Sequence, residues 1–307
     1  LQTPRLRQVV PALVRYLQQA RPAAILAAMW PLTAIAPLAA CLSQTGCRIL
    51  VSEHNTLSLQ YASRGGLHNS AMRASMAAGY RLAHARVGVS TGVVQDVAAL
   101  SGLKRSQFEV INNPVPQREI PSPQSLADAD AMWGIPRGPR VVTVGSFKAQ
   151  KNHHLLLKSL TLMVDGGVRL MFVGTGEGEA RLRAAASELN ITDRVIFAGF
   201  HADPTPFYMT ADLFVLSSDY EGFGNVIVEA LSCGLPVVST DCPSGPAEIL
   251  DNGRFGRLVP VNDADALSQA MTQALAQPHD KDLLKARARD FDPEKAARKY
   301  LAALGLA

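Results

Sequence analysis

Short apolar runs of strand length alternate with amphipathic segments of helix length along nearly the whole chain. This alternation is typical of parallel sheets whose crossover helices cover both faces. With 307 residues, 48% of them hydrophobic, the chain is long enough for two domains that each bury a core. The pattern therefore predicts the α/β class, with two doubly wound domains. Ligands bind such sheets beyond the carboxyl ends of the strands, so functional residues are expected in the loops at those ends.

In the first part of the chain, seven segments follow this pattern. The expected strands are Ala23–Met29, Arg48–Ser52, Arg86–Ser90 and Phe108–Ile111, and the expected helices are Leu32–Ser43, Asn69–Leu82 and Gly92–Ser101. Six prolines between Pro114 and Pro139 then indicate a linker. We therefore expect an N-terminal domain over 1–118 and a Pro-rich linker over 119–139. We also expect a second domain over 140–290. A C-terminal helix over 291–307 is expected to pack back toward the first domain.

The alternation starts again after the prolines. The expected strands are Arg140–Gly145, Arg169–Gly174, Val195–Gly199, Leu213–Ser217, Pro236–Ser239 and Gly256–Val259. The expected helices between them are Asn152–Met163, Glu179–Leu189, Pro204–Thr210, Asn225–Ser232 and Gly245–Asp251, with two or three more after Ala264. A second parallel sheet is thus expected, and the two domains are expected to face a cleft.

The segment from Ser217 to Leu231 is the most informative for function. A buried strand leads into a Gly-rich turn and then a helix from about Asn225, and two acidic residues eight apart, Glu221 and Glu229, bracket the turn. A helix N-terminus attracts phosphate, and a nearby carboxylate suits the hydroxyl donors of a ribose. The pattern predicts a site for a phosphate, a ribose and a third, hydroxyl-rich group.

Three more loops follow strands of the second half. The loop Gly145–Asn152 places Lys148 and Lys151 just before a helix, where lysines can clamp a diphosphate or can simply be solvated. Gly174-Thr175-Gly176-Glu177-Gly178 only partly resembles a dinucleotide fingerprint, and Glu177 would repel a pyrophosphate, so a tight turn is favoured over an NAD site. Asp241–Pro246 opens another helix with small residues.

Histidines and acidic pairs give weaker signals. His54 follows a first-domain strand at the ligand-facing end, which suits a catalytic or substrate contact, although a surface role is the default. His153 and His154 begin a helix and are expected at the surface. The pairs Asp128/Asp130 and Asp263/Asp265 mimic a metal motif, but a linker and a helix start explain them, so no metal is expected.

Charge and cysteine content indicate which kinds of binding partner and which cellular compartment suit the chain. Residues 1–121 hold 12 basic and 4 acidic side chains, whereas the rest holds 18 basic and 22 acidic. An anionic membrane surface or an anionic acceptor would suit the basic half, and solvated arginines are the alternative. No nucleic-acid motif accompanies the charge. The four cysteines lack zinc spacing and are expected as reduced thiols of a cytosolic protein.

Taken together, these segments resemble retaining GT-B glycosyltransferases, in particular family 4. The acidic pair Glu221–Glu229 resembles the E-x7-E signature of that family. Similar segments in the family's order are Gln150–Asn152, Val173–Glu177, Ala211–Phe214, Gly234–Asp241 and, ending the first domain, Ile111–Val115. The stretch Asp241–Leu250 resembles a subgroup that builds bacterial lipopolysaccharide, capsule and other surface glycans.

The resemblance implies a role for each matching residue. Glu229 would bind the ribose, Glu221 would face the donor sugar, and Lys151 would stabilise the diphosphate leaving group. His54 would lie near the donor sugar at the cleft. The remaining donor-binding positions are Gly222, Phe223, Gly224, Asn225, Ser146, Lys148, Gly174 and Gly176. No cofactor and no metal are implied, because the second domain would hold the leaving-group charge itself.

The implied activity is transfer of a hexose or N-acetylhexosamine from a nucleotide sugar, preferably UDP-linked, to a lipid-linked, lipopolysaccharide or capsule glycan. The expected location is the cytoplasm, with a peripheral position on the inner face of the plasma membrane as an option. Two departures support an alternative. Ser146 stands where the family usually has arginine, and the chain begins without Met, as if the leading strands of the first domain were missing. The alternative is a catalytically impaired module that binds nucleotide sugars.

Overall fold

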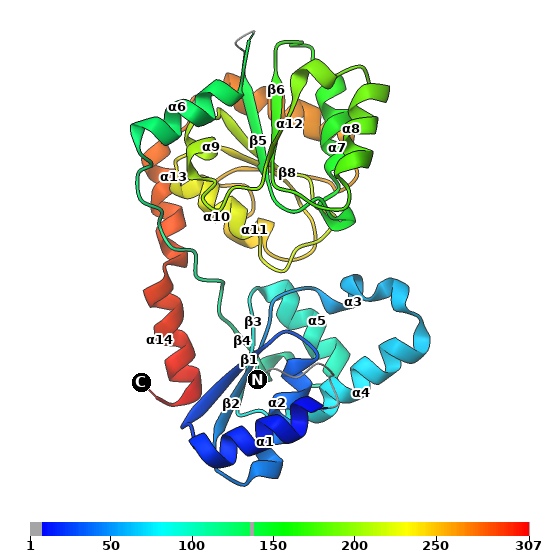
Figure 1. The fold of residues 1–307 in the computed structure, drawn as a ribbon, viewed down its shortest axis with the longest axis vertical. Helices are drawn as coiled ribbons and strands as arrows, with labels where there is room; N and C mark the ends of the chain where they lie inside the picture. Colours follow the sequence, from blue (N-terminus) through cyan, green and yellow to red (C-terminus); the bar gives the residue numbers. More distant parts are fainter. Residues whose placement is uncertain (1–7, 136–137, 307) are drawn as a thin grey trace. The chain divides into compact units, whose positions relative to one another are not determined.

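The computed structural model describes residues 8–135 and 138–306, which form two compact units. The first unit combines Leu1–Pro114 with the C-terminal segment Pro293–Ala307, and the second is continuous, from Val115 to Asp292. Figure 1 shows a sheet with its own helices in each unit. All strand pairs in both sheets are parallel.

The first unit has a four-stranded sheet in the order β1-β2-β3-β4. Its strands are β1 (Ala24–Ala28), β2 (Arg48–Glu53), β3 (Ala85–Gly88) and β4 (Glu109–Val110). Its helices are α1 (Val9–Ala20), α2 (Leu32–Ser43), α3 (Leu57–Gln60), α4 (Gly66–Leu82), α5 (Thr91–Ser101) and α14 (Pro293–Leu304). The helix α1 was not expected from the sequence; it packs on α2 through an apolar side that includes the buried Leu17.

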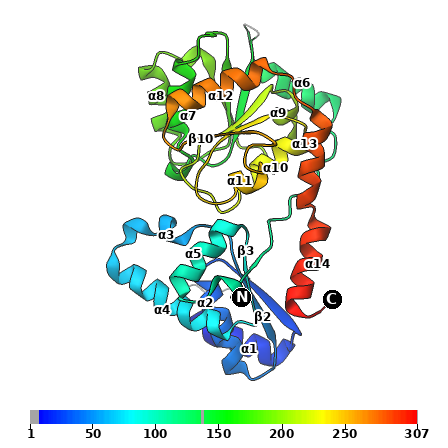
Figure 2. The same ribbon diagram turned by 180° about the vertical axis from the view of Figure 1, so that it is seen from behind.

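The last helix of the chain completes the core of the first unit. Ala296 and Leu304 of α14 share a buried cluster with Leu50 of β2 and Val87 of β3, and α14 runs alongside β2 in Figure 2. Successive strand residues point to opposite faces, so Leu50 meets α14 while its neighbours on β2 meet the helices of the other face.

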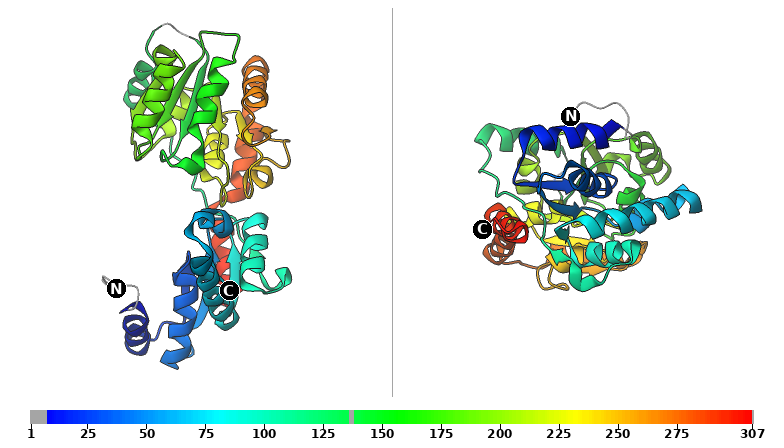
Figure 3. Two further views of the ribbon diagram at one scale, coloured as in Figure 1. Left: turned by 90° about the vertical axis from the view of Figure 1, so that its right-hand side faces the viewer. Right: turned by 90° about the horizontal axis from the view of Figure 1, so that it is seen from below.

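The second unit has six strands in the order β10-β9-β8-β5-β6-β7. They are β5 (Arg140–Val144), β6 (Arg169–Val173), β7 (Val195–Gly199), β8 (Leu213–Leu216), β9 (Val237–Thr240) and β10 (Arg257–Val259). The helices are α6 (Pro123–Met132), α7 (His153–Thr161), α8 (Glu179–Glu188), α9 (Thr205–Met209), α10 (Asn225–Ser232), α11 (Pro246–Ile249), α12 (Ala264–Ala276) and α13 (Lys281–Ala288). Helices cover both faces of this sheet, as the left view of Figure 3 shows.

The expected linker over 119–139 is wrong in its middle, where α6 forms. Ser122 caps this helix by accepting from the amide of Ser125, and Pro123 occupies its first turn, where a missing N–H costs nothing. Trp133, directly after α6, is fully buried and donates its indole N–H to Thr210 Oγ1 at 3.1 Å. The prolines therefore begin a packed helix of the second unit instead of a free connection.

The order of strands fixes where a ligand site can form in the second unit. The chain runs outward from β5 to β6 and β7, then returns to place β8 on the other side of β5, so the direction of winding reverses between β5 and β8. Ligands bind at such a switch point, beyond the carboxyl ends of the two strands. The loops after β5 and β8 are the ones that carry Lys151 and Glu221.

Candidate functional site

The loops after β5 and β8 meet through an ion pair. The Nζ of Lys151 lies 2.6 Å from Oε1 of Glu221, and the two side chains are 17% and 8% exposed. The same carboxylate oxygen accepts a hydrogen bond from Ser218 Oγ at 2.6 Å. The amide of Glu221 donates to the carbonyl of Pro243, in the loop after β9, at 3.1 Å. Glu221 is thus held from three loops, with its charge compensated by lysine.

Further hydrogen bonds tie these two loops together. Gln150 donates to the carbonyl of Tyr220 at 2.8 Å, and Asn152 donates to Asp219 Oδ1 at 2.7 Å. Ser217 Oγ donates to the carbonyl of Lys151 at 2.9 Å. The position of Lys151 relative to Glu221 is therefore fixed by hydrogen bonds between the two loops.

Close backbone approach explains two glycines in this region. At Gly245, whose φ is +90°, a Cβ would lie 1.8 Å from the carbonyl oxygen of Phe223. At Gly174, whose φ is +145°, a Cβ would lie 2.0 Å from the carbonyl oxygen of Gly145. Both positions exclude a side chain because loops pack on loops. The tight turn expected at Gly174 thus serves packing between the loops after β5 and β6.

The helix α10 begins at Asn225 and carries Glu229 about one turn inside. Gly222, Phe223 and Gly224 precede it and are buried, whereas Asn225 is exposed. The ring of Phe223 packs against Phe291 with centroids 5.3 Å apart, so its side chain belongs to the interior. A helix N-terminus next to Lys151 makes this end of the sheet favourable for an anion.

The carboxylate of Glu229 has two partners in the described chain. Tyr208 OH donates to its Oε2 at 3.0 Å, and Arg118 Nη2 lies 3.8 Å from its Oε1. Glu229 is 17% exposed and Arg118 37%. A partly accessible carboxylate, fixed on one side, is suited to accept hydroxyl donors.

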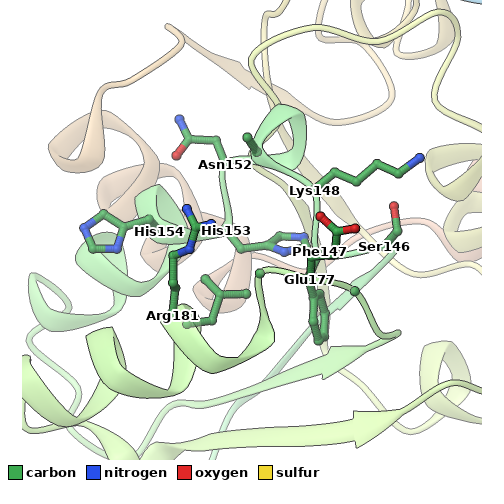
Figure 4. A pocket seen from close by; sticks show the side chains of 12 residues that line it. Ser146, Phe147, Lys148, Asn152, His153, His154, Glu177 and Arg181 are labelled. Atoms are coloured by element: carbon green, nitrogen blue, oxygen red, sulfur yellow. The ribbon is translucent and has the colours of Figure 1, made fainter.

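Three of the other predicted donor residues line a separate cavity of about 730 Å³ between the loops after β5 and β6. Ser146, Lys148 and Gly176 contribute to its wall. Figure 4 shows the carboxylate of Glu177 in the middle of this cavity, with Arg181 on the side away from Ser146. The structure therefore gathers Lys151 and Glu221 in one place, and Ser146, Lys148 and Gly176 in the neighbouring one.

The expectation that His153 lies at the surface is wrong. Its ring packs edge-on against Phe147 and Phe172, with centroids 5.4 and 5.2 Å away, and only 5% of the residue is exposed. Burial and the charge of Lys151 lower the pKa of His153 to about 3, so the imidazole is neutral. His154 is exposed, as expected.

In the first unit, His54 directly follows β2 and is half-buried. Its Nε2 lies 3.1 Å from Ser52 Oγ, and burial lowers the pKa of the ring, against a hydrogen bond to Asn113. The preceding residue, Glu53, is 1% exposed and accepts hydrogen bonds from the amide of Trp30 and from Tyr80 OH. Burial raises the pKa of Glu53 to about 7. His54 is thus presented as a neutral ring beside a buried carboxyl.

Sequence reasoning missed Ser218, Tyr208 and Arg118. Ser218 lies inside the segment from Ser217 to Leu231, and its place between strand and turn was an available signal. Tyr208 and Arg118 meet Glu229 only through tertiary packing, which no local pattern reports.

Three of the four residues in the acidic pairs have structural partners. Asp128 accepts from Gln124 at 2.7 Å, and Asp130 pairs with Arg140. Asp263 caps α12 by accepting from the amide of Ala266. Within residues 8–135 and 138–306, no three His, Cys, Asp or Glu side chains are grouped as a metal site.

In the part of the chain that the structure describes, no helix is both long enough and apolar enough to traverse a bilayer.

Comparison with known proteins finds similarity over both units. The family model described as "Glycosyltransferase Family 4" matches residues 2–118, and the one described as "Glycosyl transferases group 1" matches residues 138–277. The chain is 37% identical over 138 residues, 45% of its length, to the lipopolysaccharide core biosynthesis glycosyltransferase LpsE of Rhizobium meliloti. It is 29% identical over 219 residues, 69% of its length, to an N-acetylgalactosaminyltransferase of Campylobacter jejuni that acts on a diphospho-undecaprenol-linked acceptor. The chain spans 40% and 58% of the lengths of these two relatives.

The fold is shared with solved structures, among them the lipopolysaccharide outer core galactosyltransferase WaaB, which aligns with a TM-score of 0.76 at 20% identity, over 97% of this chain and 79% of that one. The structure of HepE from Anabaena in complex with UDP aligns with a TM-score of 0.83 at 21% identity, over 98% of this chain and 82% of that one. HepE has also been solved with UDP-glucose, again with a TM-score of 0.83, at 22% identity and over 99% and 84% of the two chains. The expected GT-B fold class is confirmed by this likeness.

Proposed function

The chain belongs to glycosyltransferase family 4, and on that premise we propose that it is a retaining glycosyltransferase. It moves a hexose or N-acetylhexosamine from a nucleotide diphosphate sugar to a lipid-linked, lipopolysaccharide or capsule glycan. The observation that carries the proposal is the Lys151–Glu221 pair at the switch point, directly before the N-terminus of α10 and its Glu229.

Each of these residues has a different role in the reaction. Lys151 and the N-terminus of α10 stabilise the diphosphate as the bond between sugar C1 and phosphate oxygen breaks. Glu229 accepts the ribose hydroxyls, and Glu221 faces the donor sugar. The acceptor oxygen bonds to C1 from the same face, and its proton passes to the departing phosphate. His54, neutral because its pKa is lowered, is proposed as a further contact of the donor sugar.

The choice of UDP and of a glycan acceptor is supported by the relatives. HepE has been solved with UDP and with UDP-glucose, and the two curated relatives act in lipopolysaccharide core biosynthesis and on an undecaprenol-linked acceptor. Lys148 and Ser146 lie on the wall of the neighbouring cavity, where they can extend the contacts to the donor.

Calorimetric titration with UDP, GDP and ADP tests the donor site. We expect saturable binding of UDP, and Glu229→Ala should weaken it by about 1–3 kcal/mol because ribose hydroxyls lose their acceptor. Asp263→Ala, which removes a helix-capping carboxylate of the same unit, is the matched control and should bind UDP as the wild type does. Equal affinity of the wild type and Glu229→Ala would refute the assignment of Glu229.

The alternative, a catalytically impaired module, is favoured by Ser146, which replaces a cation expected beside the diphosphate. Transfer from UDP-glucose and UDP-N-acetylhexosamines to a lipopolysaccharide or undecaprenol-linked acceptor separates the two proposals. Turnover above background, with the anomeric configuration retained in the product, supports the enzyme. Nucleotide binding without turnover on this panel supports the module.

The basic first unit also supports a peripheral position on the cytoplasmic face of an anionic membrane. Leu67 at the start of α4 is 88% exposed, and arginines flank it. Replacing Arg64, Arg73 and Arg81 by Gln should weaken binding to anionic liposomes by roughly 1 kcal/mol for each charge. The control replaces three exposed arginines of the second unit, Arg183, Arg254 and Arg289. Equal binding to neutral and anionic liposomes, insensitive to salt, would contradict this location.

A further inference from the structure

The carboxylate of Glu229 is fixed from the interior side by a tyrosine on a different element. Tyr208 lies on α9, and its hydroxyl donates to Oε2 of Glu229 at 3.0 Å. The terminal torsion of a glutamate is soft, so the carboxylate rotates unless a partner holds it. Tyr208 is such a partner, because its own place is set by the core.

The ring of Tyr208 is only 2% exposed and meets Phe214 of β8 edge-on, with centroids 5.7 Å apart. Two residues further on, Thr210 accepts a hydrogen bond from the buried Trp133, which anchors the end of α9. Burial and the neighbouring Glu229 charge raise the pKa of Tyr208 well above its usual value. The hydroxyl therefore keeps its proton at neutral pH and remains a donor to the carboxylate.

The second oxygen of Glu229 is held more loosely. Arg118 Nη2 lies 3.8 Å from Oε1, and the arginine side chain is 37% exposed. An ion pair at this distance and exposure is weak and screened by water. Ribose hydroxyls can replace it at little cost, while the bond from Tyr208 stays in place.

We propose that Tyr208 is a positioning residue that orients the Glu229 carboxylate toward the ribose, and thereby sets the preference for ribose over 2′-deoxyribose. The inference rests on the proposed nucleotide site. A purely structural tyrosine would stabilise the fold without affecting that preference, so the ratio of affinities for the two sugars separates the roles.

The experiment titrates the full chain and Tyr208→Phe with UDP and with 2′-deoxyuridine diphosphate. We expect the Kd for UDP to rise about 3- to 10-fold in Tyr208→Phe, the net effect of one typical hydrogen bond, and the ratio of the two Kd values to fall toward one. Tyr80→Phe is the matched control, because Tyr80 is equally buried and donates to the carboxylate of Glu53. It should leave both Kd values unchanged.

A double-mutant cycle completes the test. In a Glu229→Ala background, Tyr208→Phe should have no further effect on the Kd for UDP. If Tyr208→Phe fails to fold, Glu229→Gln with Tyr208 intact takes its place. The tyrosine hydroxyl then selects the amide oxygen, the amide NH2 faces the ribose, and the ratio should again fall toward one.

An unchanged ratio in Tyr208→Phe overturns the inference even where thermal stability falls, and so does a wild type that binds UDP and the 2′-deoxy analogue equally. In both cases the proposed nucleotide site survives. A wild type that binds neither compound overturns the nucleotide site together with the inference.

Discussion

Lys151 Nζ and Glu221 Oε1 lie 2.6 Å apart at the switch point of the second sheet, and Ser218 adds a hydrogen bond of 2.6 Å to the same oxygen. A buried charge that loses its partner becomes costly. Lys151 therefore has two roles. It neutralises the buried Glu221, which stabilises the loops, and it is the cation proposed to stabilise the diphosphate leaving group.

Replacing Lys151 by Met should affect both properties. We expect turnover to fall about 100- to 1000-fold, through loss of electrostatic stabilisation of the leaving group. We also expect the unfolding free energy of the second unit to fall by about 3 kcal/mol, because Glu221 stays buried without its cation. Steady-state kinetics and denaturant unfolding measure the two effects. Lys158→Met, on the exposed side of α7, is the control, and wild-type turnover in Lys151→Met would contradict the assignment.

The buried His153 should make the second unit acid-sensitive. Its pKa in the folded chain is about 3, below the ordinary 6.5, so the unfolded chain binds the extra proton as the pH falls below 6.5. Protonation of His153 in the unfolded chain therefore lowers the unfolding free energy by about 1.4 kcal/mol for each pH unit between 6.5 and 3. Chemical unfolding from pH 7 to pH 4, compared with His153→Leu, should show a flatter profile in the variant. Parallel profiles would show that His153 carries a proton in the fold.

Glu53 should have the opposite dependence in the first unit. Its folded-state pKa is about 7, above the ordinary 4.5, so the folded chain holds a proton that the unfolded chain has released. The unfolding free energy contributed by this group is therefore full below pH 4.5 and falls as the pH rises through 7. Unfolding of Glu53→Gln, which cannot ionise, should lack this slope. A steeper fall with rising pH in Glu53→Gln than in the wild type would contradict the expectation.

Gly245→Ala should disrupt the loops that hold Glu221. The new Cβ would lie 1.8 Å from the Phe223 carbonyl oxygen, at a residue whose φ is +90°. Gly253→Ala is a matched control, since its φ is +100° but the nearest atom to a new Cβ is 3.6 Å away. Positive φ alone costs about 1 kcal/mol, so we expect Gly253→Ala to lose only that amount and Gly245→Ala to lose several times more. Thermal unfolding and UDP titration measure the difference, and equal losses would exclude the close approach as the cause.

Much of this organisation can be predicted from the sequence because period and spacing are local signals. The alternation of strands and helices identified both sheets, and the turn between Glu221 and Glu229 was located together with the start of α10. Contacts that depend on how elements pack could not be predicted in this way. The prolines before α6 indicated a linker, although Pro123 starts a helix. His153 at a helix start gave no sign of which face would be buried, and Tyr208 lies 21 residues from its partner Glu229.

The helix α14, whose Ala296 and Leu304 complete the core around Leu50 and Val87, has a consequence for synthesis on the ribosome. The second unit is one continuous stretch, so all of its residues are available before the last helix leaves the exit tunnel. The strands of the first unit precede the second unit in the chain, but their core closes only after α14 has been synthesised. The face of these strands that meets α14 stays uncovered throughout that interval, so the first unit matures after the second one, which follows it in the chain.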